Sequence, residues 1–150
     1  MTAAPSALTD HLGYWLRKVS NAVSGRFAGA LGARGFTVPE WVMLRELLEA
    51  ERSPAQLATR MGMTKGGITK LADRLAGRGL IVRRSSATDG RSVTLSLTEA
   101  GREVVPDLAA LADANDAAFF DPLTDDERRR LRALLVGLAD RHRLGPSPVD

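Results

Sequence analysis

The residues best suited to chemistry in this chain are the basic side chains gathered between positions 53 and 97. That segment carries eight lysines and arginines against two aspartates, whereas the whole chain of 150 residues has a net charge of +3. The rest of the chain is therefore net acidic, and the positive charge is concentrated in one part. Cations grouped in this way neutralise phosphates, which is the charge distribution expected of a protein that binds nucleic acid. These cations are Arg60, Lys65, Lys70, Arg74, Arg78, Arg83, Arg84 and Arg91.

Two short helical patterns in this segment predict how the cations are positioned. The first pattern covers Ser53 to Arg60, Gly62 supplies a turn residue that tolerates positive φ, and Thr64 is placed to cap the second helix. This is the plan of a helix-turn-helix, whose second helix enters the major groove of DNA by its N-terminal end. The residues expected to meet the DNA there are Thr64, Lys65, Gly66, Gly67, Thr69 and Lys70.

Several residues of these two helices, and two arginines that follow them, allow two interpretations. Gly66 and Gly67 cost helix stability, so they either allow close approach of the backbone to DNA or reflect tolerance at a frayed turn. The neighbouring arginines either contact the DNA backbone or simply keep the surface solvated. These arginines are Arg74, Arg78, Arg83 and Arg84, and we include Arg74 and Arg84 among the expected DNA-binding residues.

A β-hairpin is predicted to follow the second helix. Positions 80–82 and the alternating positions 93–97 have the pattern of two paired strands, and an Asp-Gly turn signal lies between them. Arg91 lies at the hairpin tip, where a guanidinium suits a narrow minor groove. Asp89 either holds that arginine in a bidentate pair or makes the turn.

Long amphipathic helices are predicted on both sides of this module. Positions 8–31 form one apolar stripe with Ser6 or Thr9 as a cap, and capping-box spacings begin further helices at positions 37 and 124. The helix that begins at position 98 contains Pro106, which is expected to kink it or to mark a late start. Because the first and last stripes lie outside the module, a symmetric interface between two copies is expected to bury them.

The central module resembles the MarR family of winged helix-turn-helix regulators. The resemblance rests on MTKGGITKLADRLAGRGLIVRR at 63–84 and DGRSVTLSLTEAG at 89–101, which contain the Asp-x-Arg-Ser wing signature and the Leu-Thr-x-x-Gly that follows it. It covers nearly all of the chain. It implies a mainly α protomer of six helices with a small β wing, in which 37–97 form the DNA-binding lobe and 6–33 with 98–145 form the dimerisation helices.

The resemblance also implies a function. A ligand-responsive transcriptional repressor would bind a palindromic operator as a homodimer, with positions 64–70 in the major groove and Arg91 in the minor groove. A small aromatic or lipophilic effector would release the DNA, and no cofactor is implied. Relatives that sense oxidants use a cysteine, and this chain has none.

The two tryptophans are the candidates for lining an effector pocket. Trp15 and Trp41 both fall in the first two predicted helices, and packing in the core is favoured over ligand binding for each.

Other classes of function receive little support from the sequence. No phosphate-binding glycine loop or catalytic motif is present, so we do not expect an enzyme, and the lone His11 and His142 do not suggest a metal site. No apolar stretch approaches the ~20 residues of a membrane helix and no signal peptide is recognised, so a soluble cytoplasmic protein is expected. A winged-helix module that binds protein instead of DNA is disfavoured by the concentrated positive charge.

Overall fold

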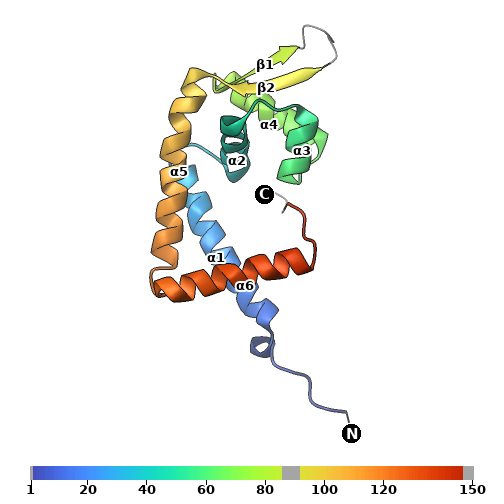
Figure 1. Cartoon of the computed structure of the whole chain (residues 1–150), viewed down its shortest axis with the longest axis vertical. Coiled ribbons are helices and arrows are strands. Elements are labelled where there is room, and N and C mark those ends of the chain that lie inside the picture. The colour runs from blue at the N-terminus through green and yellow to red at the C-terminus, as the bar shows by residue number, and fades with distance from the viewer. Residues whose placement is uncertain (1, 86–91, 147–150) are drawn as a thin grey trace.

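The computed structural model describes residues 2–85 and 92–146 and contains six α-helices and one two-stranded sheet in these ranges (Figure 1). The predicted mainly α fold with a small β wing is confirmed. In order, the elements are the 3₁₀ turn η1 (Leu8–Asp10), α1 (Leu12–Gly32), α2 (Val38–Glu49), α3 (Pro54–Met61), α4 (Lys65–Gly77), β1 (Ile81–Ser85), β2 (Val93–Leu97), α5 (Glu99–Phe119) and α6 (Asp125–Arg141).

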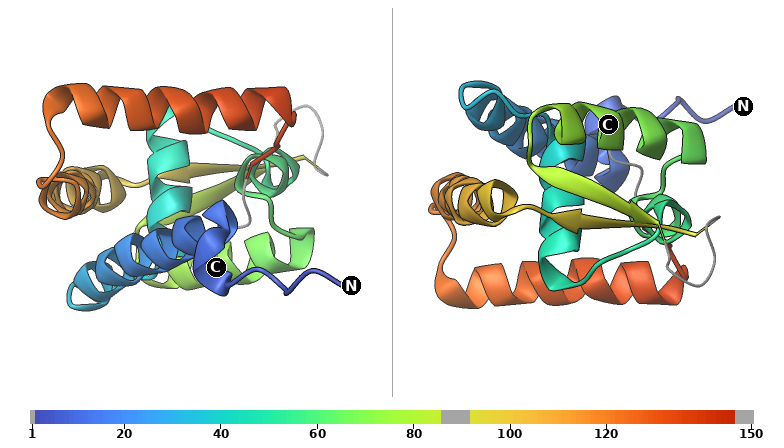
Figure 2. Two further views of the ribbon diagram at one scale, coloured as in Figure 1. Left: turned by 90° about the horizontal axis from the view of Figure 1, so that it is seen from below. Right: turned by 90° about the horizontal axis from the view of Figure 1, so that it is seen from above.

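The elements separate into a compact lobe and a frame of long helices. Figure 1 shows α2, α3, α4 and the hairpin gathered at one end of the molecule, with α1 and α5 running away from them and α6 crossing the far end. Seen from the end, α1 and α6 lie on opposite sides of α5 (Figure 2). α6 and α1 are therefore separate parts of the frame, each on its own side of α5.

Side-chain caps decide where most of the helices begin. The hydroxyls of Thr37, Ser53 and Thr124 each accept a hydrogen bond from the backbone N–H three residues later. The side chain of that later residue in turn accepts a hydrogen bond from the backbone N–H of the cap residue. Thr64 and Thr98 accept the same kind of bond from Gly67 and Gly101. These bonds satisfy N–H groups that a helix start leaves unpaired. The predicted helix starts at Thr37, Ser53, Thr64, Thr98 and Thr124 are confirmed.

The start of the first helix differs from the prediction. A short 3₁₀ turn occupies Leu8–Asp10, the chain is extended at His11, and α1 begins at Leu12 without a side-chain cap from Ser6 or Thr9. The Asp10 carboxylate accepts from the Ala7 N–H at 2.9 Å, and the His11 ring lies 3.1 Å from the Ala7 carbonyl. These local bonds close a separate turn, so the polar groups that would cap a longer helix are already satisfied.

Pro106 lies inside an uninterrupted α5, so the helix does not start late. The neighbouring residues Val105 and Leu108 are buried in the core. Their packing compensates for the hydrogen bond that proline cannot donate.

The two strands form an antiparallel hairpin attached to the lobe. Ile81 pairs with Leu97 and Ser85 with Val93, and Leu80 stands just before the first strand instead of inside it. Arg52, between α2 and α3, forms an isolated bridge with Leu95. The base of the hairpin is thereby fixed to the helix-turn-helix.

One apolar cluster forms the core of the lobe. It comprises the inner faces of α2, α3 and α4, the hairpin base, Leu31 at the end of α1 and two residues of α5. The inner face of α4 lies wholly in this cluster, since Ile68, Leu71, Ala72 and Leu75 are all buried. In α2, Met43 is fully buried, whereas Leu48 is exposed.

Candidate nucleic-acid interface

The first turn of α4 presents polar and basic groups to solvent. Thr64 caps the helix by accepting from the Gly67 N–H at 3.0 Å, and Lys65, Thr69 and Lys70 are exposed on the outer face. The opposite face of the helix is buried against the lobe, so these side chains have one direction in which to project. Free N–H groups and the positive end of the helix dipole at this end favour a phosphate.

The two glycines of this turn have different surroundings. A Cβ at Gly66 would meet no atom within 4 Å, whereas a Cβ at Gly67 would lie 3.2 Å from Met63 Cε and from Thr64 Oγ1. Tight local packing therefore explains the glycine at position 67. No contact inside the described part of the chain explains the glycine at position 66, which leaves the backbone accessible there.

The four arginines near this turn divide into two groups. Arg83 pairs with Asp73 at 2.5 Å and lies 3.4 Å from the Thr69 carbonyl, and Arg78 pairs with Glu40 at 3.1 Å. Arg74 and Arg84 are exposed, on α4 and β1 respectively. The sequence left two interpretations for all four, and the structure gives Arg78 and Arg83 intramolecular partners.

Asp89 and Arg91, the expected wing-tip residues, lie outside the described residues. The strands that lead to them, β1 and β2, stand at the same end of the molecule as α4 (Figure 1). Arg83 connects the two elements, because it belongs to β1 and its partner Asp73 to α4.

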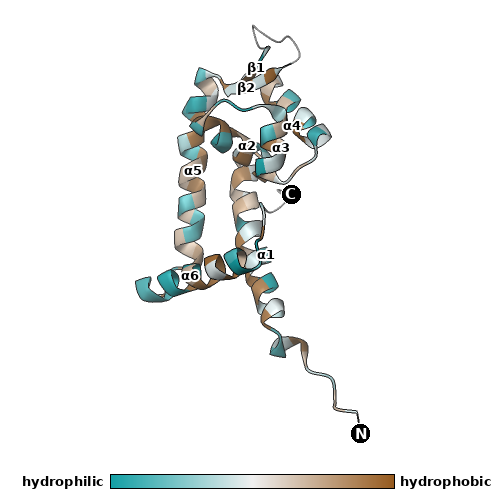
Figure 3. Ribbon diagram, turned by 45° about the vertical axis from the view of Figure 1, so that its right-hand side comes forward, coloured by the Kyte–Doolittle hydropathy of each residue, from teal (hydrophilic) through white to brown (hydrophobic). Residues whose placement is uncertain are grey.

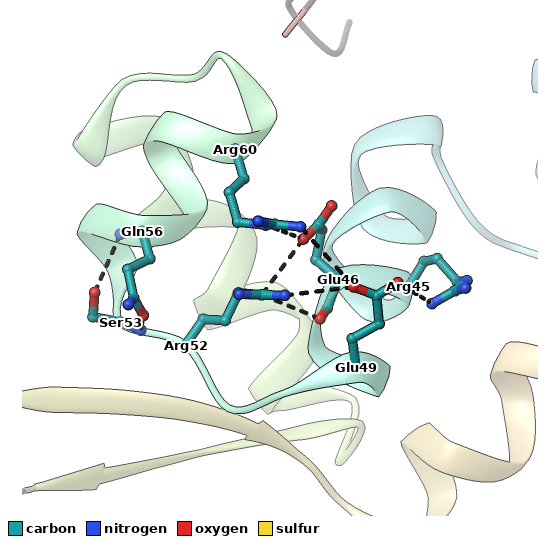
Figure 4. A network of polar contacts seen from close by, with 7 residues as sticks. All are labelled: Arg45, Glu46, Glu49, Arg52, Ser53, Gln56 and Arg60. Carbon is teal, nitrogen blue, oxygen red and sulfur yellow. Dashed lines mark hydrogen bonds and ion pairs between the residues drawn. The ribbon is translucent and has the colours of Figure 1, made fainter.

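An ion-pair network joins α2 to α3 and was missed by sequence reasoning (Figure 4). Glu46 accepts from Arg60 at 2.5 Å and lies 3.4 Å from Arg52, and Glu49 pairs with both Arg45 and Arg52. Hydrogen bonding to Glu46 raises the pKa of Arg60 above its ordinary value. The acidic end of α2 was visible in the sequence, but its partners lie beyond the turn in α3. The network holds the first helix of the helix-turn-helix on α2.

A second joint connects the hairpin to α5 through the Leu-Thr-x-x-Gly motif. Thr98 donates from Oγ1 to the Gly79 carbonyl at 2.6 Å and from its backbone to the Leu80 carbonyl at 3.0 Å. A Cβ at Gly101 would stand 2.2 Å from that same Leu80 oxygen. Glycine at position 101 is thus required by the close approach of the α4–β1 turn to α5.

The two tryptophans do not share a pocket. The Trp15 indole donates to the Thr9 carbonyl at 2.9 Å and packs on Tyr14, whereas Trp41 packs edge-to-face on Phe27 with centroids 6.4 Å apart. Phe27 is twelve residues beyond Trp15, so about 18 Å of helix separates them. The structure places Trp15 on the frame and Trp41 where α1 meets the lobe.

A groove of about 890 Å³ lies between α5 and α6. Its walls combine acids of α5, arginines of α6 and apolar side chains, among them Asp116, Phe120, Arg128, Leu135 and Val136. Neither tryptophan lines it. The groove adjoins the exposed leucines of α6.

Two other kinds of site are missing from the part of the chain that is described. Residues 2–85 and 92–146 contain no group of three or more histidine, aspartate or glutamate side chains able to hold a metal ion. Among the helices in those ranges, none has the length and apolar character needed to cross a membrane.

The chain is similar in sequence to known proteins. A model described as the MarR family matches residues 34–92. The HTH-type transcriptional repressor Rv2887 of Mycobacterium tuberculosis is 31% identical over 128 residues, which cover 85% of this chain and 92% of that protein.

Two solved structures are similar along most of their length. The crystal structure of the M. tuberculosis MarR family protein Rv2887 with salicylic acid superposes with a TM-score of 0.68 and 31% identity, covering 91% of this chain and 97% of that one. CouR from Rhodococcus jostii RHA1 bound to p-coumaroyl-CoA gives a TM-score of 0.75 and 29% identity, covering 90% and 96%.

Proposed function

The chain belongs to the MarR family, and on this premise we propose that it is a ligand-responsive transcriptional repressor that binds a palindromic operator as a homodimer. It acts on double-stranded DNA in the cytoplasm and catalyses no reaction. The observation that carries this proposal is the exposed N-terminal part of α4, where a capped helix start, Lys65, Lys70 and an open glycine lie together.

Each part of the interface has a separate role in the proposal. The turn from Thr64 to Lys70 enters the major groove, with Lys65 and Thr69 placed to contact base edges. Arg74 and Arg84 bind phosphates on either side. From the sequence, Arg91 is proposed for the minor groove, and Asp89 either pairs with it or makes the turn.

The homodimer is supported by apolar surface on the frame. Leu12, Leu16 and Val19 of α1 and Leu134 and Leu138 of α6 are exposed, and Figure 3 shows hydrophobic residues along both helices. α6 buries none of its residues within one chain. A second copy that covers these faces would place two α4 helices on half-sites about one helical turn apart.

A small aromatic effector is proposed from the relatives, whose structures hold salicylic acid and p-coumaroyl-CoA. Between the two tryptophans, Trp41 is the better-placed candidate, because it belongs to α2 of the lobe and packs against Phe27 of α1. Binding there would favour a different arrangement of the lobe and the frame. Trp15 is the second candidate, on the frame itself. No cofactor is required.

The decisive experiment selects duplexes from a random pool and measures affinity for the recovered sequence against salt concentration. A palindromic consensus and a steep negative slope are expected, since each neutralised phosphate releases counterions. Arg91→Ala should reduce the slope by about one unit. A flat salt dependence would instead favour a winged-helix module that binds protein.

Release by an effector is tested with the same duplex. Salicylate and larger phenolic acids should raise the dissociation constant for DNA in wild-type protein, and Trp41→Phe should shift the concentration of compound that is needed. Trp15→Phe serves as the matched comparison on the frame. If neither tryptophan variant alters the response, the effector site lies elsewhere.

A further inference from the structure

Arg78 makes three contacts at the C-terminal end of α4. Its Nη1 donates to the Gly35 carbonyl at 3.0 Å and to Glu40 Oε2 at 3.1 Å, and its guanidinium lies 4.2 Å from the centroid of the Phe36 ring. All three partners belong to the α1–α2 turn or to the first turn of α2. A planar guanidinium can stack on the Phe36 ring while Nη1 donates both hydrogen bonds, whereas a lysine ammonium has no plane to stack on the ring.

The side chain of Glu40 is buried at this site. Its side chain is 7% exposed, while that of Arg78 is 39% exposed. One carboxylate oxygen accepts from the Thr37 N–H at 3.0 Å in the capping box, and the other accepts from Arg78. A buried carboxylate that loses its partner is costly, so the pair stays closed.

The contact lies at the opposite end of α4 from the DNA-facing turn. Arg78 is the C-cap of the helix and Thr64 the N-cap, and thirteen residues span about 20 Å between them. A tilt of about 5° at the Arg78 end would move the Thr64 end by about 2 Å, given that helix length. Such a shift exceeds the tolerance of a hydrogen bond to a base edge.

We propose that Arg78 is a positioning residue: anchored by Gly35, Phe36 and Glu40, it fixes the angle at which α4 is presented to DNA relative to α1. This inference rests on the proposed DNA-binding function and deepens it. A basic residue of the recognition helix thus serves operator binding through its intramolecular contacts and leaves the phosphates to other cations. Because Gly35 lies in the short turn that follows α1, the anchor also ties the orientation of α4 to the frame.

The test distinguishes positioning from a phosphate contact, because the variants change the charge at position 78 and the geometry of its contacts separately. Arg78→Lys keeps the charge and loses the geometry, and Arg78→Gln removes the charge. Glu40→Gln keeps the capping-box acceptor and weakens the anchor. Arg74→Gln, at an exposed arginine of the same helix, is the matched control for a lost phosphate contact. Each variant is measured on the selected duplex over a range of salt concentrations, with its melting temperature recorded.

Positioning predicts that Arg78→Lys and Glu40→Gln each weaken operator binding by about tenfold, whereas Arg78→Gln leaves the salt slope unchanged. The Arg78→Lys/Glu40→Gln double variant should lose little more than either single variant, because both changes break one anchor. Arg74→Gln should lower the slope by about one unit. Should Arg78→Gln be unstable, Glu40→Gln and the double variant carry the test.

Two outcomes overturn the inference. One is wild-type affinity in Arg78→Lys and Glu40→Gln; the other is a salt slope reduced by Arg78→Gln to the same extent as by Arg74→Gln. Failure of the proposed function itself would look different, because wild-type protein would then show no salt-dependent binding to any duplex.

Discussion

The lobe and the frame of this molecule bury their apolar residues in different ways. The lobe closes its core within one chain, since α2, α3, α4 and the hairpin base share a single cluster of buried side chains. The frame does not, because α6 buries no residue and the N-terminal half of α1 exposes leucines and Trp15. Hydrophobic burial is the main driving force of folding, so the core of the lobe, completed by the adjoining parts of α1 and α5, closes within one chain, whereas α6 and the N-terminal half of α1 leave apolar surface uncovered.

Polar contacts follow the same division. In the lobe, three ion pairs connect different elements: Arg60 with Glu46, Arg78 with Glu40, and Arg83 with Asp73. In α6, Arg128 and Arg129 pair with Asp125 and Asp126 of the same first turn. Contacts between elements set the relative orientation of helices, and contacts within a turn support only that turn. The lobe is therefore held together by ion pairs between its elements, whereas α6 is joined to the end of α5 by Arg128, whose Nη1 donates to the Phe120 and Leu123 carbonyls.

The largest expected effect comes from placing charge on the uncovered face of α6. Leu134→Glu with Leu138→Glu should give monomers and lower affinity for a palindromic duplex by about 100-fold or more, because the second half-site would no longer be held nearby. Sedimentation velocity and operator titration measure both. Leu48→Glu, at an exposed leucine of the lobe, is the control and should remain dimeric. A dimer that survives the double substitution would contradict the assignment of this face.

The next effect tests the closed packing of the lobe. Gly101→Ala places a methyl group against the Leu80 carbonyl and should destabilise the protein by about 1–3 kcal/mol, as overpacking does. A drop in melting temperature of several degrees is expected, with the sedimentation coefficient unchanged. Gly77→Ala is the same substitution at a position with no atom within 4 Å of the new Cβ, and it should not lower the melting temperature. Equal melting temperatures for the two variants would argue against the close approach at Gly101.

A smaller effect separates stability from function at the start of α4. Gly66→Ala should stabilise the fold by up to about 1 kcal/mol, since alanine is the better helix former. The same change should weaken DNA binding if the backbone approaches the duplex there. Gly67→Ala is the comparison, because its methyl group would crowd Met63 and Thr64 and offset the gain in helix propensity. Unaltered affinity in Gly66→Ala would remove the close approach from the proposed interface.

The smallest effect concerns the capping box of α6. The Thr124 N–H donates to the Glu127 carboxylate at 3.0 Å and lowers the pKa of Glu127 below its ordinary value of 4.5. The stability gained from this charge is present above pH 4.5 and is lost as the pH falls through the lowered pKa. Glu127→Gln keeps an acceptor at this position, so the difference in melting temperature from wild type should shrink on acidification. A pH-independent difference would show that the charge contributes nothing.

Local sequence rules predicted much of the fold. Capping residues and the spacing of apolar side chains act within about four residues, and this explains why the helix starts at Thr37, Ser53, Thr64, Thr98 and Thr124 were predicted correctly. The same rules failed at His11, where three short-range polar bonds close a separate turn before α1.

What the sequence determined by itself is the order of the elements, the concentration of positive charge in the DNA-facing module, and the family signature that surrounds it. Only the tertiary structure decided which of that module's arginines have partners within residues 2–85 and 92–146. Arg78 meets Glu40 across 38 positions and Arg83 meets Thr69 across 14, and no periodic pattern encodes such separations. The structure also places the two tryptophans apart, because Trp15 lies in the first turn of α1 and Trp41, on α2, packs against Phe27 farther along α1. These outcomes depend on how helices pack, and packing is set by the whole core.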